Sequence, residues 1–172
     1  MHAYRQGELD ALCGVYSLVN ADRIINRTTH QHSKQLFYSI ICFLEREGLL
    51  PLIIEEGIHF RHIKKLLVRV IGKQRIAYQK RHFRKKSYTD ISTFWNEMMR
   101  FLDNDPNRAI LLGMTGVHDH WTVVCKITKL QMTLYDSSGL RRLHRLHCTT
   151  RYAMGKCQHI LHPAQTYFLK ND

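Results

Sequence analysis

Two kinds of hydrophobic periodicity divide this chain, and their order limits the folds that it can adopt. Apolar residues recur at helical spacing in four early segments, 13–28, 32–47, 57–72 and 90–103. Short apolar runs typical of strands follow at 108–114, 120–127, 131–135 and 165–169, with a weaker candidate at 75–79. Helices followed by strands indicate an α+β fold, in which a helical half packs on a small antiparallel sheet.

The chain is long enough to form one self-sufficient domain. It has 172 residues, of which 44% are hydrophobic, and a domain of this size buries roughly 70% of the surface of its unfolded chain. No internal repeat and no linker rich in Gly, Ser or Pro divides it. We therefore expect a single domain over 1–172, with a helical part at about 1–105 and a sheet part at about 106–172.

The sequence gives no sign of a membrane or secreted protein. Its longest uncharged apolar runs, such as 48–54, are far shorter than the ~18 residues that a membrane span needs, and the first residues contain no apolar stretch typical of a signal peptide. Of the five cysteines, Cys42 and Cys125 lie in apolar runs, where a free thiol packs as a small core residue. We expect a cytoplasmic protein with reduced thiols and no membrane span, and export through a specialised secretion route stays open.

The net charge of +12 is concentrated in one segment. Residues 57–89 hold 11 basic groups and no acidic group. The basic patch that we single out there consists of Arg61, Lys64, Lys65, Arg69, Arg81, Arg84, Lys85 and Lys86. Such a segment attracts nucleic acid or an acidic protein, although a solvated helix face followed by a basic loop explains it equally well.

A cysteine at the start of a helical pattern is the first candidate for chemistry. Cys13 opens the segment 13–28, and the N–H groups and dipole at a helix N-terminus favour a thiolate. Gly14 leaves space for a substrate beside the sulfur, and Gln6, about two turns upstream, donates its amide to an oxyanion alongside the Cys13 N–H. Taken alone, a cysteine in a first helical turn is more often structural.

A histidine and an aspartate lie in the two runs that form the expected hairpin. A two-residue loop near 128–130 places Asp136 opposite Trp121, and a shift of one residue places it opposite His120 or Thr122. His120 and Asp136 are therefore within one rung of each other. A carboxylate that holds one imidazole nitrogen leaves the other nitrogen for a thiol, so we interpret this pair as a candidate base and its orienting group.

The order Gln6, Cys13-Gly14, His120-Trp121 and Asp136 resembles that of the papain-like cysteine peptidase superfamily. It is most similar to the compact bacterial members, such as the leader-peptide peptidase domains of bacteriocin exporters and effector proteases. The resemblance spans residues 6 to about 139, and a closing strand at 165–169 completes it. It implies a papain-like fold with the nucleophile at the start of the central helix, and it makes Cys13 the nucleophile, His120 the base, Asp136 the orienting residue and Gln6 the oxyanion donor.

The chain departs from the usual pattern at three points. Gln6 lies seven residues before Cys13, which is longer than the usual spacing. Asp10 opposes a thiolate unless it caps the helix. His118, which we place on the same strand face as His120, is a rival base, but His120 directly precedes the aromatic residue and the apolar run.

The resemblance implies a thiol-dependent acyl-transfer hydrolase without a cofactor, most simply a protease that cleaves a peptide or isopeptide bond in a protein substrate. The basic charge makes an acidic protein one candidate for that substrate. The same triad also serves glutamine deamidases and transamidases. A third interpretation is a non-catalytic papain-like module that binds nucleic acid or an acidic partner through the basic 57–89 segment.

The C-terminal region collects residues that can bind zinc. These are His144, His147, Cys148, Cys157, His159 and His162. Their spacing matches no common zinc-binding pattern. We therefore expect no metal site there, and we interpret the histidines as exposed residues of a basic surface.

Overall fold

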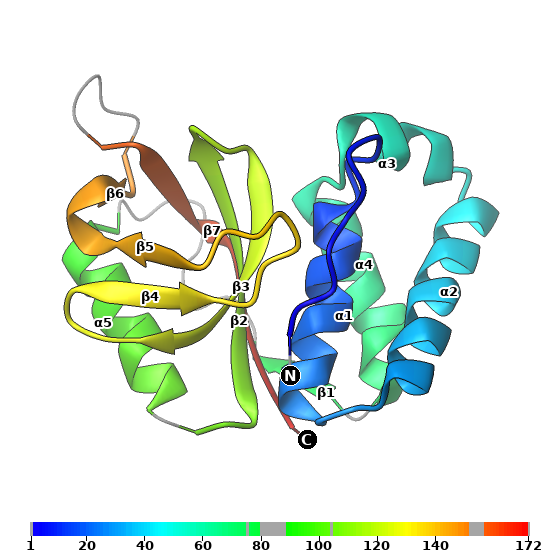
Figure 1. The fold of residues 1–172 in the computed structure, drawn as a ribbon, viewed down its shortest axis with the longest axis horizontal. Helices are drawn as coiled ribbons and strands as arrows, with labels where there is room; N and C mark the ends of the chain where they lie inside the picture. The colour runs from blue at the N-terminus through cyan, green and yellow to red at the C-terminus, as the bar shows by residue number, and fades with distance from the viewer. Residues whose placement is uncertain (1, 75, 80–88, 104, 152–156, 172) are drawn as a thin grey trace.

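The computed structural model describes residues 2–74, 76–79, 89–103, 105–151 and 157–171 (Figure 1). Its helices are α1 (Cys13–Ile25), α2 (His30–Arg46), α3 (Leu50–Glu56), α4 (Phe60–Arg69) and α5 (Ile91–Leu102), with short 3-10 turns η1 (Ile71–Gln74) and η2 (Arg145–His147). Its strands are β1 (Ile76–Gln79), β2 (Arg108–Gly116), β3 (His120–Ile127), β4 (Gln131–Leu134), β5 (Arg142–His144), β6 (Cys148–Thr149) and β7 (His159–Asn171). Among these elements, no helix has both the length and the apolar character that a membrane crossing requires.

The strands form one sheet in the order β1-β7-β2-β3-β4-β5, and β6 also pairs with β7. The α+β class is therefore confirmed. We expected a wholly antiparallel sheet, and this detail is wrong, because β6 runs parallel to β7. The division at residue 105 is also inexact, since β1 joins the sheet edge from within the helical part.

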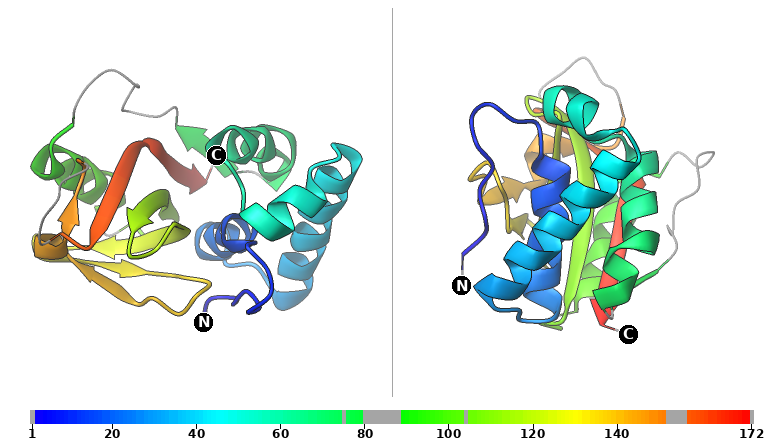
Figure 2. Two further views of the ribbon diagram at one scale, coloured as in Figure 1. Left: turned by 90° about the horizontal axis from the view of Figure 1, so that it is seen from above. Right: turned by 90° about the vertical axis from the view of Figure 1, so that its right-hand side faces the viewer.

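Helices cover both faces of the sheet. Ala109 and Leu111 of β2 point toward α1, whereas the alternate residues Ile110 and Leu112 belong to a second core beneath α5. Figure 1 shows α5 on the side of the sheet away from α1–α4, and Figure 2 shows the same separation from above. The expected single helical layer is thus corrected: four helices lie on one face and α5 lies on the other.

Most of the expected helices are present, with shifted ends. Asp90 caps α5 as predicted, because its Oδ1 accepts hydrogen bonds from the N–H groups of Ser92 and Thr93. The segment 57–72 contains a shorter helix, α4, followed by η1. Helix α3, with Pro51 in its first turn, was not predicted from the sequence.

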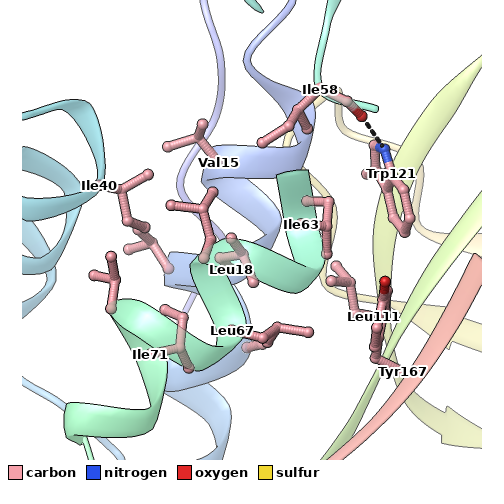
Figure 3. Close-up of a cluster of buried hydrophobic side chains, with 14 of the residues drawn as sticks. Val15, Leu18, Ile40, Ile58, Ile63, Leu67, Ile71, Leu111, Trp121 and Tyr167 are labelled. Atoms are coloured by element: carbon pink, nitrogen blue, oxygen red, sulfur yellow. Dashed lines mark hydrogen bonds between the residues drawn. The ribbon is translucent and has the colours of Figure 1, made fainter. Parts of the chain in front are cut away.

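Helix α1 lies at the centre of the helical layer (Figure 3). Val15 and Leu18 are buried in one cluster with Ile40 of α2, Leu67 of α4 and Leu111 of β2. A helix that is enclosed by other elements in this way has little freedom to shift. Its first residue, Cys13, is therefore held in a fixed position relative to the sheet.

Gly14 is required by this packing and does not make room for a substrate, so that expectation is wrong. A Cβ atom built on Gly14 lies 2.0 Å from Cγ2 of Ile58, 3.2 Å from Cδ1 of Ile63 and 3.3 Å from Cδ1 of Trp121. All three side chains are buried. The absence of a side chain lets α1 approach the chain that links α3 to α4.

Replacing Gly14 with alanine is expected to destabilise the fold by about 2 kcal/mol, because overpacking outweighs the higher helix propensity of alanine. Urea unfolding measures the change. The exposed substitution Ser39→Ala in α2 is the control and should stay within about 0.5 kcal/mol of wild type. A Gly14→Ala protein as stable as wild type would contradict the close packing.

Candidate active site

Cys13 is the first residue of α1, and the loop before it is ordered by a carboxylate. Asp10 accepts hydrogen bonds from the backbone N–H of Gly7 at 2.9 Å (Oδ2) and of Leu12 at 3.0 Å (Oδ1). Leu12 is the N-cap residue of α1, and no side chain caps this helix. Asp10 therefore shapes the turn that leads into Cys13 and is not a helix cap.

His120 and Asp136 form a buried pair. His120 is the first residue of β3, and Asp136 follows β4. The ring atom Nε2 of His120 lies 2.6 Å from Oδ2 of Asp136, and the two side chains are 7% and 0% exposed. The other carboxylate oxygen, Oδ1, accepts from the backbone N–H of Ser138 at 2.8 Å and of Leu140 at 3.0 Å. The loop after β4 thus fixes the carboxylate on the side that faces away from His120.

The register of the hairpin differs by one residue from the pairing of Asp136 with Trp121 that a two-residue loop predicts. Val124 pairs with Leu134, and the register shifts between Val124 and Lys126. Continued past the end of β4, the Val124–Leu134 pairing places Asp136 opposite Thr122 and not opposite Trp121. This is one of the one-residue shifts that the sequence left open.

The pKa of His120 is raised to about 9. Burial by itself lowers it, but hydrogen bonding and charge interaction with Asp136 and with Cys13 outweigh the burial. Since Nε2 is engaged by Asp136, Nδ1 is the ring nitrogen left for Cys13. Burial raises the pKa of Asp136, yet its hydrogen bond and charge interaction with His120 bring it below the usual carboxyl value. The imidazolium–carboxylate form of the pair is therefore favoured at neutral pH.

Gln6 lies beside the same loop. Its backbone N–H donates to the carbonyl of Ser137 at 3.1 Å, and the Ser137 hydroxyl donates to Oε1 of Gln6 at 3.4 Å. Because the side-chain oxygen faces Ser137, the amide nitrogen of Gln6 is available to a ligand. The turn at Asp10 takes up the longer spacing between Gln6 and Cys13.

His118 does not share a strand face with His120. It lies in the loop before β3, is exposed, and stacks on His159 with ring centroids 6.0 Å apart. It is also not among the residues that line the cleft around Cys13. The structure therefore places His120, and not His118, at the cleft beside Cys13.

Gln6, Cys13 and His120 border a cleft of about 650 Å³. One wall is formed by the N-terminal segment and the α3–α4 region, and the other by β2, β3 and β7. The lining residues include Gln6, Asp10, Cys13, Glu56, Phe60, Arg61, Thr115, Asp119, His120, Trp121 and Gln165. The sequence-predicted residues Gln6, Cys13 and His120 thus meet at one cleft, and Asp136 holds His120 from behind.

Two anchoring contacts were not foreseen. The hydroxyl of Ser17 donates to the backbone carbonyl of Trp121 at 2.9 Å, and Nε1 of Trp121 donates to the carbonyl of Ile58 at 2.8 Å (Figure 3). Ser17 lies one turn after Cys13, and Trp121 is adjacent to His120. The Ser17 bond therefore fixes the helix that carries the thiol against the strand that carries the imidazole, and the Trp121 bond fixes that strand against the link between α3 and α4. A polar residue on the buried face of the first predicted helix was the only signal for Ser17.

The remaining predicted residues lie elsewhere. Arg61, Lys64, Lys65 and Arg69 are exposed on α4, and Arg81, Arg84, Lys85 and Lys86 lie outside the described residues. Within the described part of the chain, no group of three His, Cys, Asp or Glu side chains is placed to hold a metal ion. His159 is buried, so the expectation of exposed C-terminal histidines is wrong for that residue.

Neither protein-family models, nor curated proteins, nor solved structures provide a match to this chain. Its function is therefore inferred from the side chains around Cys13 themselves.

Proposed function

We propose that this protein is a papain-like thiol hydrolase, acting as a cysteine protease on a protein substrate. The observation that carries the proposal is the buried His120–Asp136 pair, 2.6 Å apart, which interacts with Cys13 at the start of α1. A thiol, an imidazole and a carboxylate in this order form the arrangement used for nucleophilic acyl transfer. A structural histidine has no need of both a buried carboxylate and a thiol as partners.

The arrangement of the elements supports the papain-like interpretation. The nucleophile begins a central helix that other helices surround, the base begins a strand on the adjoining sheet, and the orienting carboxylate follows the next strand. The sequence resemblance implies this order and these positions. Cys13 and His120 come from separate parts of the chain, so their meeting at one cleft is not a consequence of sequence proximity.

The proposed reaction proceeds in two steps. The thiolate of Cys13 attacks the carbonyl carbon of the scissile bond, and the Cys13 N–H and the Gln6 amide hold the resulting oxyanion. His120 then protonates the leaving amine, and a thioester joins the acyl group to Cys13. In the second step His120 takes a proton from water, which attacks the thioester and releases the acid and the free thiol. Asp136 keeps the ring in position throughout.

Alkylation by iodoacetamide tests the thiol without a known substrate. At pH 6 we expect Cys13 to react at least about 10-fold faster than Cys42, because a thiolate paired with an imidazolium persists where an ordinary thiol is protonated. Cys42 is the internal reference, since it is exposed, contrary to the core position expected from its apolar run, whereas Cys13 is 8% exposed. Peptide mapping by mass spectrometry measures both rates in one sample.

His120→Ala is expected to remove this advantage, and His118→Ala is the matched control that should retain it. Burial raises the pKa of Cys125, and burial together with Cys157 raises that of Cys148 to about 12, so these thiols should react slowest. Equal rates for Cys13 and Cys42 at pH 6, or an advantage that persists in His120→Ala, would refute the proposed thiol–imidazole pair. A non-catalytic module would then be the better interpretation.

A further inference from the structure

Helix α4 carries a row of positive charge on its exposed face. Arg61, Lys65 and Arg69 are spaced four residues apart, so they lie on one side of the helix, and all three are exposed. Lys73, in the 3-10 turn that follows, is also exposed and extends the row. We call Arg61, Lys65, Arg69 and Lys73 the α4 track.

The two ends of the track lie at two different cavities of the surface, a cleft and a groove. At one end, Arg61 lines the cleft that contains Cys13. At the other end, Arg69 and Lys73 line a groove of about 860 Å³ between α2 and the end of α4. Figure 2 shows these two helices side by side in its right-hand view. A chain lying along the track therefore passes from the groove to the thiol.

The groove combines positive charge with an apolar floor. Arg46 of α2 adds a third cation to Arg69 and Lys73. Glu47 also lines the groove, so three cations face one carboxylate there, and Phe43 and Val70 contribute apolar surface. Small apolar surfaces with cations at the rim suit amino-acid side chains that alternate between acidic and apolar character.

Little acidic charge offsets the track. In the described part of the chain, Lys65 is the one member with an acidic partner, Glu47, at 3.0 Å. Arg61 instead donates from Nε to Nε2 of His62 at 3.2 Å. Asp10, Glu56 and Asp119 line the cleft itself but form no ion pair with the track. The surplus of positive charge is therefore open to a partner.

We propose that the α4 track is a docking surface for an acidic segment of the protein substrate, a statement that rests on the proposed thiol hydrolase activity. The eight steps from Arg61 to Arg69 span about 12 Å of helix at 1.5 Å per residue. An extended peptide covers that length in about four residues at 3.3 Å each. Acidic residues are thus favoured about four or more positions from the bond that enters the cleft.

A protein segment fits this surface better than a nucleic acid. The track leads into a site whose chemistry acts on carbonyl groups, and the groove at its far end offers apolar contacts for side chains. Glu47 beside the track, and Glu56 where it enters the cleft, oppose a continuous chain of phosphates but are tolerated by separated carboxylates.

The binding test uses the full-length Cys13→Ala protein, so that no turnover occurs, with a fluorescein-labelled hexaglutamate peptide as probe. Fluorescence anisotropy should show binding that weakens as NaCl rises from about 50 to about 300 mM. Adding Arg69→Gln and Lys73→Gln together should weaken binding roughly 10-fold. Arg141→Gln with Arg142→Gln, at exposed positions by β5, removes the same net charge and should weaken it less than 2-fold.

If both double substitutions weaken binding equally, only net charge matters and the proposed docking surface is wrong. The proposal is also wrong if the peptide does not bind at low salt. Tighter, track-dependent binding of a single-stranded oligonucleotide than of the peptide would replace the acidic protein with a nucleic acid. Alkylation of the wild-type chain reports on the thiol site independently. Track-dependent peptide binding together with an unreactive Cys13 would therefore refute the hydrolase alone.

Discussion

Substituting Asp136 with alanine is expected to lower acyl transfer by about a thousandfold, because His120 then loses both its orientation and the charge that favours its imidazolium form. Burial lowers the pKa of His120, and Asp136 is the strongest of the groups that oppose this effect. Without the carboxylate, the pKa of His120 is expected to fall, because burial is then opposed by Cys13 alone. Turnover of p-nitrophenyl acetate measures the loss, since this ester is hydrolysed through a thioester without a specific recognition site.

Asp119→Ala is the matched control for that substitution. Asp119 is an exposed carboxylate that lines the same cleft and directly precedes His120, but it takes no part in the buried pair. We expect it to change the ester turnover by less than 3-fold, on the order of an exposed charge effect. Comparable losses in Asp119→Ala and Asp136→Ala would mean that Asp136 acts only through the charge of the cleft.

The second large effect is a loss of stability at high pH. The pKa of His120 is about 9 in the folded protein against about 6.5 in an unfolded chain. A group whose pKa is raised by folding stabilises the protein fully below the unfolded value, and this contribution is lost as the pH rises through the folded value. At about 1.36 kcal/mol per pH unit, the contribution is about 3 kcal/mol and disappears between about pH 6.5 and pH 9.

Chemical denaturation at pH 6 and at pH 10 measures this effect as a difference between proteins. The unfolding free energy of wild type should exceed that of Asp136→Asn at pH 6, and this gap should be about 3 kcal/mol smaller at pH 10. Comparing the two proteins at each pH cancels the titration of other groups. His118→Gln, at an exposed position, should show the same pH dependence as wild type. If the gap between wild type and Asp136→Asn is the same at both pH values, His120 is not held as an imidazolium.

At the acid end, the sign is reversed. The pKa of Asp136 is below its usual value in the folded protein, so the stability that it contributes is present above the unfolded value of about 3.9 and is lost as the pH falls further. The buried pair is therefore most stabilising in the neutral range, where the proposed reaction also needs both charges.

Much of the candidate site was predictable because its parts follow local rules. The helical pattern that begins at Cys13 placed the thiol at a helix N-terminus, and the hairpin between the two strand-like runs brought His120 near Asp136. The exact pairing was not predictable, since it depends on the register shift between Val124 and Lys126. Likewise, strand β3 begins at His120, so His118 lies in the loop before it, where alternation no longer governs which way a side chain points.

The contacts between distant segments were beyond the reach of sequence patterns. Gly14 looked like space for a substrate, but its requirement comes from Ile58, which approaches only in the folded protein. Strands β5 and β6 have three and two residues, too few for a periodic signal. The placement of α5 on the second sheet face depends on the fold as a whole, because its amphipathic pattern fits either face equally well.

The position of β7 determines how early in synthesis the proposed site can form. This strand comes after the other six in sequence, yet it is inserted between β1 and β2 in the sheet. A ribosome that has added Asp136 has already added Cys13 and His120, but the sheet beside them still lacks an inner strand. Since β7 pairs with β2, and β2 pairs with the strand that carries His120, the proposed pair of Cys13 and His120 is expected to assemble only after β7 has been synthesised.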